Sequence, residues 1–240
     1  MHRVISRRGF VRSAVSAGVV VSVSPAFAQL GTTSAALTKE ERDRMTPDQV
    51  IAELKKGNER FRGGKVLPHD YLGQKRASAA GQYPAAVVLG CIDSRTPAEI
   101  LFDVGIGDTF SARIAGNVVN DDLLGSMEFA CAVAGAKAVV VLGHTACGAV
   151  KGAIDDVEMG NLTGLLARIK PAITATTFTG EKSSKNATYV DAVARTNVVV
   201  TLDHIRRRSS ILADLEKKGS IRIAGAMYDL ATGKVDFVTS

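Results

Sequence analysis

The stretches AAVVLGCIDSR at residues 85–95 and AVVVLGHTACG at residues 138–148 decide the fold of this 240-residue chain. Each begins with an apolar run without polar alternation, which is typical of a strand buried on both faces of a parallel sheet. The first run leads to Cys91 and the second to His144. The carboxyl ends of parallel strands share one edge of a sheet, where ligand sites collect near a switch in strand order. We therefore expect a site at that edge.

Cys91, His144 and Cys147 offer two thiolates and one imidazole, a donor set that suits tetrahedral zinc with one position left open. His144 and Cys147 are three residues apart, so a short turn into a following helix lets both face one ion. An open position is typical of catalytic zinc. The alternative is that Cys91 and Cys147 are structural ligands or a disulfide, which keeps a zinc-binding or redox function open. Cys131 lies in the apolar segment FACAV and is expected to be a buried thiol.

The chain resembles the β-class carbonic anhydrases in these two motifs and beyond them. The family carries Cys-x-Asp-x-Arg and, roughly fifty residues later, His-x-x-Cys; here Cys91 precedes His144 by 53 residues. The similarity extends from about residue 46 to the C-terminus and includes RIAGN at 113–117 and GAMYD at 225–229. Agreement in both motifs, in their order and in their spacing over this length of chain is improbable by chance.

The resemblance implies reversible hydration of carbon dioxide to bicarbonate and a proton, with one zinc ion per subunit. In that family zinc-bound hydroxide attacks the substrate, and an Asp–Arg dyad orients it, which here is Asp93 and Arg95. The family's aspartate also binds zinc and displaces water in a closed state, when its contact with the arginine is broken. Without the family, Asp93 would equally suit a helix cap beside a surface arginine. A sulfur analogue such as carbonyl sulfide or carbon disulfide would suit the same chemistry.

Four further residues match substrate-binding positions of the family. Gln82 matches a glutamine that hydrogen-bonds substrate or bicarbonate across a dimer interface, Phe110 and Phe129 match apolar pocket positions, and Gly148 matches a backbone donor near the zinc. The resemblance therefore implies a homodimer or a dimer of dimers. The apolar face of the helix expected at 46–61 also needs a partner surface.

Other positions limit the resemblance. The chain has no Trp, so the Trp-containing inhibitory site of one bicarbonate-regulated subgroup is incomplete: Val88 stands at the Trp position, although Arg113 matches the subgroup's Arg. Inhibition by bicarbonate is therefore not expected. His69 and His204 lie outside the motifs and are expected at the surface or in hydrogen bonds. Either is also a candidate proton shuttle, because the unperturbed pKa of His is near 6.5.

Residues 1–28 have the pattern of an export signal. SRRGFV at 6–11 has the twin-arginine pattern, an apolar stretch occupies 14–23, and AFA at 26–28 is a cleavage site of the small-x-small type. The apolar stretch is far shorter than the roughly 20 residues of a spanning helix. We therefore expect a twin-arginine signal peptide, no stable membrane anchor and a periplasmic or secreted protein.

Charge gives no indication of a nucleic-acid partner. Residues 1–28 contain four arginines and no acidic residue, so their removal lowers the formal net charge from +6 to +2. RRR at 206–208 is a dense basic stretch without interleaved aromatic residues, which is typical of a solvated helix face. No nucleic-acid binding is expected.

The remaining sequence predicts a flexible leader at 29–45, which is polar and small, and one α/β domain at 46–240. Alternation of strands and helices predicts a mainly parallel central sheet of four strands plus a short C-terminal strand, flanked by helices. We expect strands at 85–89, 108–114, 138–144, 220–228 and 234–238. We expect helices at 46–61, 97–102, 121–134, 146–154, 162–173 and 189–218, the last with a break near 209–210. We expect loops at 65–82, with weak helical potential after residue 71, and at 174–186.

Overall fold

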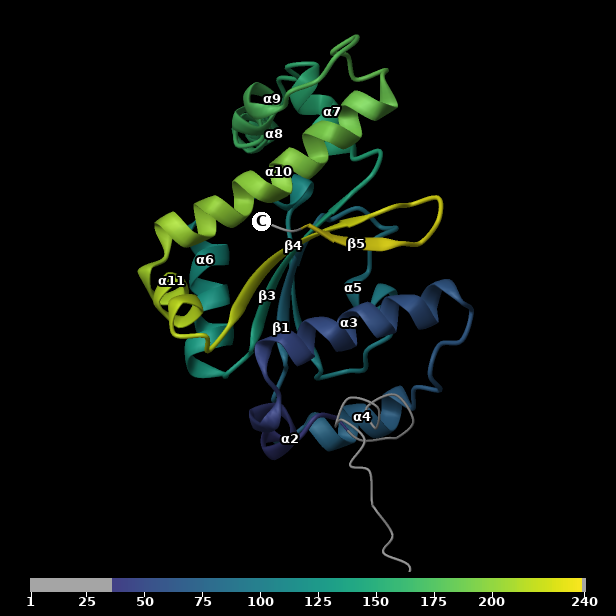
Figure 1. Cartoon of the computed structure of the whole chain (residues 1–240), viewed down its shortest axis with the longest axis vertical. Helices are drawn as coiled ribbons and strands as arrows, with labels where there is room; N and C mark the ends of the chain where they lie inside the picture. The colour runs from purple at the N-terminus through teal and green to yellow at the C-terminus, as the bar shows by residue number, and fades with distance from the viewer. Residues whose placement is uncertain (1–35, 239–240) are drawn as a thin grey trace, which may run out of the picture.

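The two apolar runs form adjacent strands at the centre of a sheet in the computed structural model of the chain, which describes residues 36–238 (Figure 1). The strand order is β2-β1-β3-β4-β5. Neighbours are parallel except for β4 and β5, which are antiparallel. The predicted fold class is confirmed. The strands are β1 (Ala86–Gly90), β2 (Thr109–Arg113), β3 (Ala138–His144), β4 (Arg222–Tyr228) and β5 (Val235–Val238).

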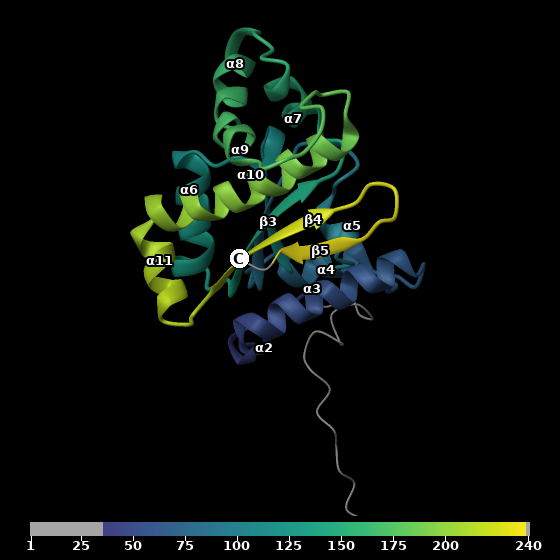
Figure 2. The same ribbon diagram turned by 45° about the horizontal axis from the view of Figure 1, so that its top comes forward.

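Both faces of the sheet are covered by helices, which explains why its central strands show no polar alternation. Every residue of β1 and β3 is buried. Successive side chains point to opposite faces, so Val87 and Val139 belong to one core and Val88 and Val140 to another. Helix α10 (Ala187–Arg208) crosses the first face and α3 (Pro47–Arg62) the second (Figures 1 and 2).

The other helices extend these two layers. Helices α6 and α11 lie beside one end of α10, whereas α7, α8 and α9 gather beside its other end, beyond the carboxyl ends of the parallel strands (Figure 2). Their bounds are α4 (Tyr71–Ser78), α5 (Ala98–Leu101), α6 (Asp121–Glu128), α7 (Gly148–Ile154), α8 (Gly160–Ala167), α9 (Lys170–Ala175) and α11 (Ser210–Lys217), with a 3₁₀ turn η1 (Ala115–Asn117) and a π-helical turn η2 (Phe129–Val133).

The described part of the expected leader is folded, so the prediction of a flexible segment to residue 45 is wrong there. Helix α2 (Lys39–Arg44) begins with a capping box in which the Thr38 and Glu41 side chains each bond the other's backbone N–H. Leu37 is buried in the second core, and the buried Arg42 donates to the Ala134 carbonyl oxygen. Two apolar anchors, Leu37 before α2 and Met45 after it, and one buried arginine hold this segment, which is too little apolar periodicity for the sequence to indicate a helix.

Three other boundaries differ from expectation. The predicted helix at 162–173 is two helices, α8 and α9, because Pro171 lacks an N–H and its ring excludes a continuous helix. The weak helical potential expected after residue 71, within the loop at 65–82, is a formed helix, α4, whose N-cap Asp70 accepts from the Gly73 N–H. The helix at 121–134 ends as the π-helical turn η2. The break near 209–210 is confirmed, since Ser209 ends α10 and caps α11.

Helix α10 approaches the sheet closely over two glycines. A Cβ on Gly143 of β3 would lie 2.6 Å from Val198 Cγ2, and one on Gly225 of β4 would lie 2.6 Å from Val198 Cγ1. Real Cβ atoms essentially never approach so near. The absence of side chains at these two positions therefore sets how deeply α10 sits on the sheet.

The expected signal peptide at 1–28 lies outside the described residues. Between residues 36 and 238, no helix combines the length and the apolarity that a membrane span requires.

Candidate metal centre

The two sequence motifs meet at a switch point of the sheet. The chain leaves β1 toward β2 on one side, whereas β3 lies on the other side of β1. In α/β sheets ligands bind at the carboxyl ends of the strands beside such a reversal. Cys91 directly follows β1, and His144 is the last residue of β3, with Gly90 in register with Leu142. Both ligand motifs are therefore at one edge.

A tight turn brings Cys147 back toward His144. Ala146 within it is left-handed, with φ of +53°, and its N–H donates to Asp191 Oδ1 on α10 at 2.8 Å. Cys147 is the N-cap of α7, yet its side chain makes no capping hydrogen bond. The turn thus leaves the Cys147 sulfur available to the cluster.

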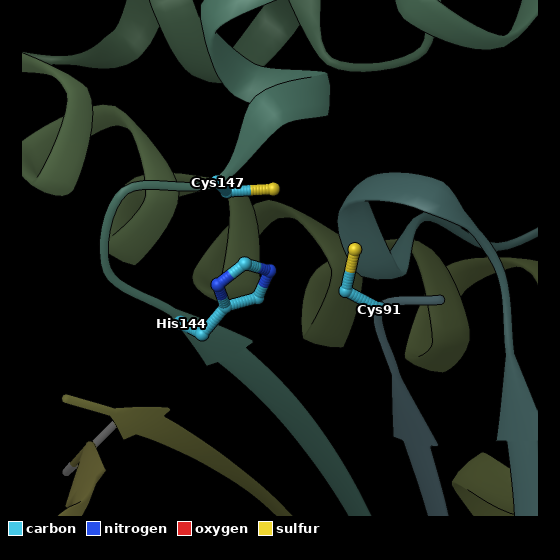
Figure 3. Close-up of side chains that lie close together, drawn as sticks. All are labelled: Cys91, His144 and Cys147. Carbon is cyan, nitrogen blue, oxygen red and sulfur yellow. The ribbon is translucent and has the colours of Figure 1, made fainter. Parts of the chain in front are cut away.

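Cys91, His144 and Cys147 point toward a common centre (Figure 3). Their ligand atoms all lie within 4.8 Å of one another, and all three residues are buried. His144 Nδ1 lies 2.9 Å from the Thr145 carbonyl oxygen, which places the proton on Nδ1 and leaves Nε2 as the lone-pair donor. His144 Nε2 is buried without a hydrogen-bond partner in residues 36–238. An orphaned imidazole nitrogen facing two sulfurs is what a metal ligand requires.

The two thiols shift each other's pKa in opposite directions. A hydrogen bond from Cys147 lowers the pKa of Cys91 to about 4, and the same contact raises the pKa of Cys147 well above its usual range. Burial lowers the pKa of His144, but the nearby Cys91 sulfur and its negative charge outweigh it and raise that pKa overall. Because a cation would favour both thiolates, this donor set of two sulfurs and one nitrogen fits zinc.

An apolar cavity of about 280 Å³ opens beside the cluster. Cys91 and Asp93 form its wall on the metal side, and Gly148 lies at the start of α7. Leu162 and Leu166 of α8 also line this cavity. A small uncharged molecule therefore has a place to bind next to the three ligands.

Asp93 and Arg95 form a bidentate ion pair at the cavity rim. Arg95 Nε lies 2.9 Å from Asp93 Oδ1, and Arg95 Nη2 lies 2.8 Å from Asp93 Oδ2. The Arg95 guanidinium holds the pKa of the Asp93 carboxyl well below its usual range. Asp93 Oδ2 is 3.9 Å from His144 Nε2, so an ionised carboxylate borders the cluster without joining it.

A family model described as carbonic anhydrase matches residues 86–235, which is more than half of the chain. The chain belongs to the carbonic anhydrase family. It is 38% identical over 187 residues to carbonic anhydrase 2 of Mycobacterium tuberculosis, covering 75% of this chain and 87% of that protein. It is 39% identical over 185 residues to the carbonic anhydrase of Mycolicibacterium smegmatis, covering 76% and 89%.

Solved structures share its fold at lower identity. A β-carbonic anhydrase of Aspergillus fumigatus has a TM-score of 0.61 at 23% identity and covers 80% of this chain and 89% of that one. Tetrameric β-carbonic anhydrases of Sordaria macrospora are similar, with a TM-score of 0.60 at 24% identity over 68% and 84% of the two chains. Together with the Cys91, His144 and Cys147 motifs, these likenesses place the chain in the β class.

Not every residue expected at the site of this carbonic anhydrase lies beside the cluster. Gly148 does, whereas Phe110 and Phe129 meet edge to face at 6.3 Å and line a different cavity of about 670 Å³, beside the edge strand β2. Gln82 is exposed in the loop before β1. Within one chain these three residues do not reach the metal ligands, and their substrate role stays a prediction that requires a second subunit.

Arg113 was expected only as half of an incomplete inhibitory site, but it holds the loop that carries the dyad. Its Nε donates to the Cys91 carbonyl oxygen at 2.8 Å, and its Nη2 contacts the Asp93 carbonyl oxygen. The Thr96 hydroxyl donates to that same Asp93 oxygen at 2.9 Å. In this carbonic anhydrase Arg113 therefore fixes the backbone on both sides of residue 92. Its place in the RIAGN motif was the signal that pointed toward the site.

The other three positions singled out in the sequence belong to the scaffold. Val88 is buried in β1. His69 is hydrogen-bonded to Asp103, as expected for a histidine outside the motifs. His204 lies on α10, and burial together with Arg207 lowers its pKa. His69 and His204 do not belong to the metal cluster.

Proposed function

We propose that this chain is a zinc enzyme that reversibly hydrates carbon dioxide to bicarbonate and a proton. The carrying observation is the convergence of three buried ligand atoms, from Cys91, His144 and Cys147, within 4.8 Å beside an apolar cavity. Zinc held there would have one open position, at which it would lower the pKa of a water molecule toward about 7. Two thiolates would balance the charge of the metal, so the site needs a local group to orient the attacking oxygen.

Asp93 is suited to that orienting role. As an ionised carboxylate it only accepts hydrogen bonds, so it selects an attacking oxygen that still carries a proton. Arg95 keeps it ionised and turns both carboxylate oxygens toward the guanidinium. Release of Arg95 would free an oxygen that is only 3.9 Å from His144 Nε2 to become a fourth ligand. The site would therefore be open while Arg95 holds Asp93 and closed when Arg95 releases it.

The cavity lining favours an uncharged substrate. Leu162 and Leu166 offer no hydrogen bond, so carbon dioxide can rest against them at little desolvation cost. Bicarbonate is charged and is poorly solvated by the same wall, which favours its release toward the rim at Asp93 and Arg95.

We also propose that the active form is a homodimer or a dimer of dimers, exported through the twin-arginine signal. Phe129 is 50% exposed and Val133 73% exposed, and Phe129 lies beside β2, the strand at one edge of the sheet. A second subunit packed there would bring its own Gln82 toward this surface. The relatives of Sordaria macrospora are described as tetrameric. Light scattering of an active monomer would contradict the assembly, and recovery of the uncleaved protein in a cytosolic fraction would contradict the export.

Zinc content and stopped-flow carbon dioxide hydration, measured together on the mature protein, test the function. We expect one zinc per subunit and fast hydration. Asp93→Asn and Arg95→Ala should each lower kcat/KM by about 10²-fold, the usual cost of losing one orienting group, while zinc stays near one per subunit. X-ray absorption at the zinc edge should show an added protein oxygen in Arg95→Ala only.

Arg207→Ala is the matched control, because Arg207 pairs with Asp203 on an exposed face of α10 away from the cluster. It should retain wild-type rates and zinc. Zinc without carbon dioxide hydration would replace the proposal with a sulfur analogue as substrate or with a binding role. Oxidised Cys91 and Cys147 without metal would replace it with a redox function.

A further inference from the structure

The Cys91 sulfur has a backbone hydrogen-bond donor from η1. The Gly116 N–H points at Cys91 Sγ with a separation of 3.3 Å, and both residues are buried. A donor so placed stabilises negative charge on sulfur and so limits how much of that charge the thiolate gives to a metal. The strength of that bond depends on how firmly Gly116 is held.

Gly116 is confined on two sides. Its φ of +70° is left-handed, which a residue without a Cβ adopts at no steric cost. A Cβ there would lie 2.6 Å from Ile169 Cδ1, so Ile169 closes the space on one side. On the other side lies the Cys91 sulfur itself. The remaining freedom of η1 is rotation of its peptides, which hydrogen bonds limit. The Asn117 N–H, on the same peptide unit as the Gly116 carbonyl, donates to the Ile114 carbonyl oxygen at 2.9 Å.

Asn197 of α10 adds a second hydrogen bond to that peptide, from a different element of the fold. Its Nδ2 donates to the Gly116 carbonyl oxygen at 2.7 Å, across 81 residues of sequence. Asn197 is 1% exposed, so water does not compete for this bond. An amide buried in the interior to reach one carbonyl of a three-residue turn carries a desolvation cost that an apolar side chain would avoid. Its placement is accounted for if the turn must be held in one orientation.

We propose that Asn197 is a positioning residue of the metal centre. By holding the Gly116 carbonyl, it keeps the Gly116 N–H directed at Cys91 Sγ, and through that bond it sets the distance and the electron donation of one of the two thiolate ligands. Helix α10 already supports the other two ligands, since Asp191 accepts from the Ala146 N–H in the turn between His144 and Cys147. One helix thus holds both halves of the site. The inference rests on the proposed zinc site.

Cobalt(II) substitution tests this directly, because thiolate-to-cobalt charge-transfer absorption reports electron donation by sulfur. Asn197→Leu removes the donor at similar volume, and Asn197→Ala removes it and leaves space. In both, we expect the band to move to longer wavelength than in the wild type, and the zinc dissociation constant from chelator competition to rise by roughly 10-fold to 100-fold, the range for partners of metal ligands. Thr196→Val, whose hydroxyl bonds Ala192 within the same helix, should leave both unchanged.

The outcomes separate the inference from the proposed function. A wild type that binds cobalt without a thiolate band would contradict the proposed zinc site itself. A normal wild-type band that stays unchanged in a folded Asn197 variant would overturn the positioning role alone. Failure of both variants to fold, judged by near-ultraviolet circular dichroism, would assign Asn197 to the scaffold and would likewise overturn the proposal.

Discussion

Two buried clusters in this protein each contain a histidine, and they differ in how completely their polar atoms are paired. Around His69, Asp103 takes Arg60 Nε at 2.5 Å and His69 Nε2 at 3.0 Å, and His69 Nδ1 lies 3.3 Å from Gln74 Nε2. Around His144, Nδ1 is paired but Nε2 is buried without a partner in the described chain. Both ring nitrogens of the first histidine are paired within the protein, whereas Nε2 of the second is left available to a ligand.

The comparison shows that an unpaired ring nitrogen is a better indicator of a ligand site than burial of the histidine alone. The His69 cluster ties α4 and the preceding loop to the end of α5, because Asp103 also accepts the Leu67 N–H at 3.2 Å. The Gln74 side chain is paired in turn, since its Oε1 accepts the Ile106 N–H at 3.0 Å. A buried polar group left unpaired costs free energy, and of these two histidines only His144 carries that cost.

The largest expected effect is at the His144 cluster. Cys91→Ala, His144→Ala or Cys147→Ala should lower zinc from one per subunit to near zero and abolish hydration, because an open site has no spare protein ligand. Inductively coupled plasma mass spectrometry with stopped-flow hydration measures both. Retained zinc in any of the three would remove that residue from the ligand set and break the comparison.

The next effect is on the His69 cluster, where the readout is stability. Asp103→Asn keeps a residue that tolerates the left-handed φ of +49° but removes the charge that pairs with Arg60. We expect a loss of about 3 kcal/mol, the lower end for breaking a buried pair, and a Tm lower by roughly 6 to 12 °C. Hydration per folded molecule should persist.

Asp203→Ala serves as the control for that change, because it breaks only an exposed ion pair on α10 and should cost less than about 1 kcal/mol. Equal destabilisation by the two variants in calorimetry would show that the His69 cluster is no better paired than the surface.

Asp108 offers a pH-dependent refinement of the comparison. Burial raises the pKa of its carboxyl to about 6, and Gly105 N–H bonds Oδ2 at 2.7 Å. Because this folded-state pKa is above the unfolded value near 3.9, its contribution to stability is present below about pH 4 and is lost as the pH rises through 6. Asp108→Asn does not titrate, so its stability relative to wild type should improve by roughly 2 to 3 kcal/mol between pH 4 and pH 8. A difference in melting temperature between Asp108→Asn and the wild type that stays constant from pH 4 to pH 8 would contradict this prediction.

The smallest effect is expected at Cys131. Burial raises the pKa of this thiol to about 12, so it stays protonated and inert. Cys131→Ala should keep zinc and hydration at wild-type levels and should lower stability by about 1 kcal/mol, the centre of the range for single substitutions. Loss of metal in this variant would extend the ligand cluster beyond Cys91, His144 and Cys147.

Sequence predicted the sheet well because its signals are local. Uninterrupted apolar runs located β1 and β3, and Ser209 marked the break between α10 and α11 by its capping chemistry. Helix α2 was missed because it docks through Leu37 and Arg42 rather than through a periodic apolar face. The division of α8 from α9 was missed because the apolar pattern continues through Pro171.

The site divides in the same way. Its three ligands stand in short motifs, so their convergence was predictable from where the strands end. Asp191 and Asn197 were not, since they act on backbone atoms that are 45 and 81 residues away. Several polar residue types can supply a hydrogen bond to a backbone carbonyl or N–H, so such a pair leaves no specific pattern in the sequence.

Gly143 and Gly225 set the distance between α10 and the sheet, and this distance determines whether side chains of α10 reach the metal centre. A methyl group at Gly143 or Gly225 would lift α10 off β3 and β4, and Asp191 and Asn197 would withdraw from both halves of the site together. A design that transferred only the CIDSR and HTACG segments onto another parallel sheet would therefore carry over the ligand residues without the hydrogen bonds from α10 that position them. The smallest transferable unit is the two strand ends, the paired glycines and the helix that rests on them.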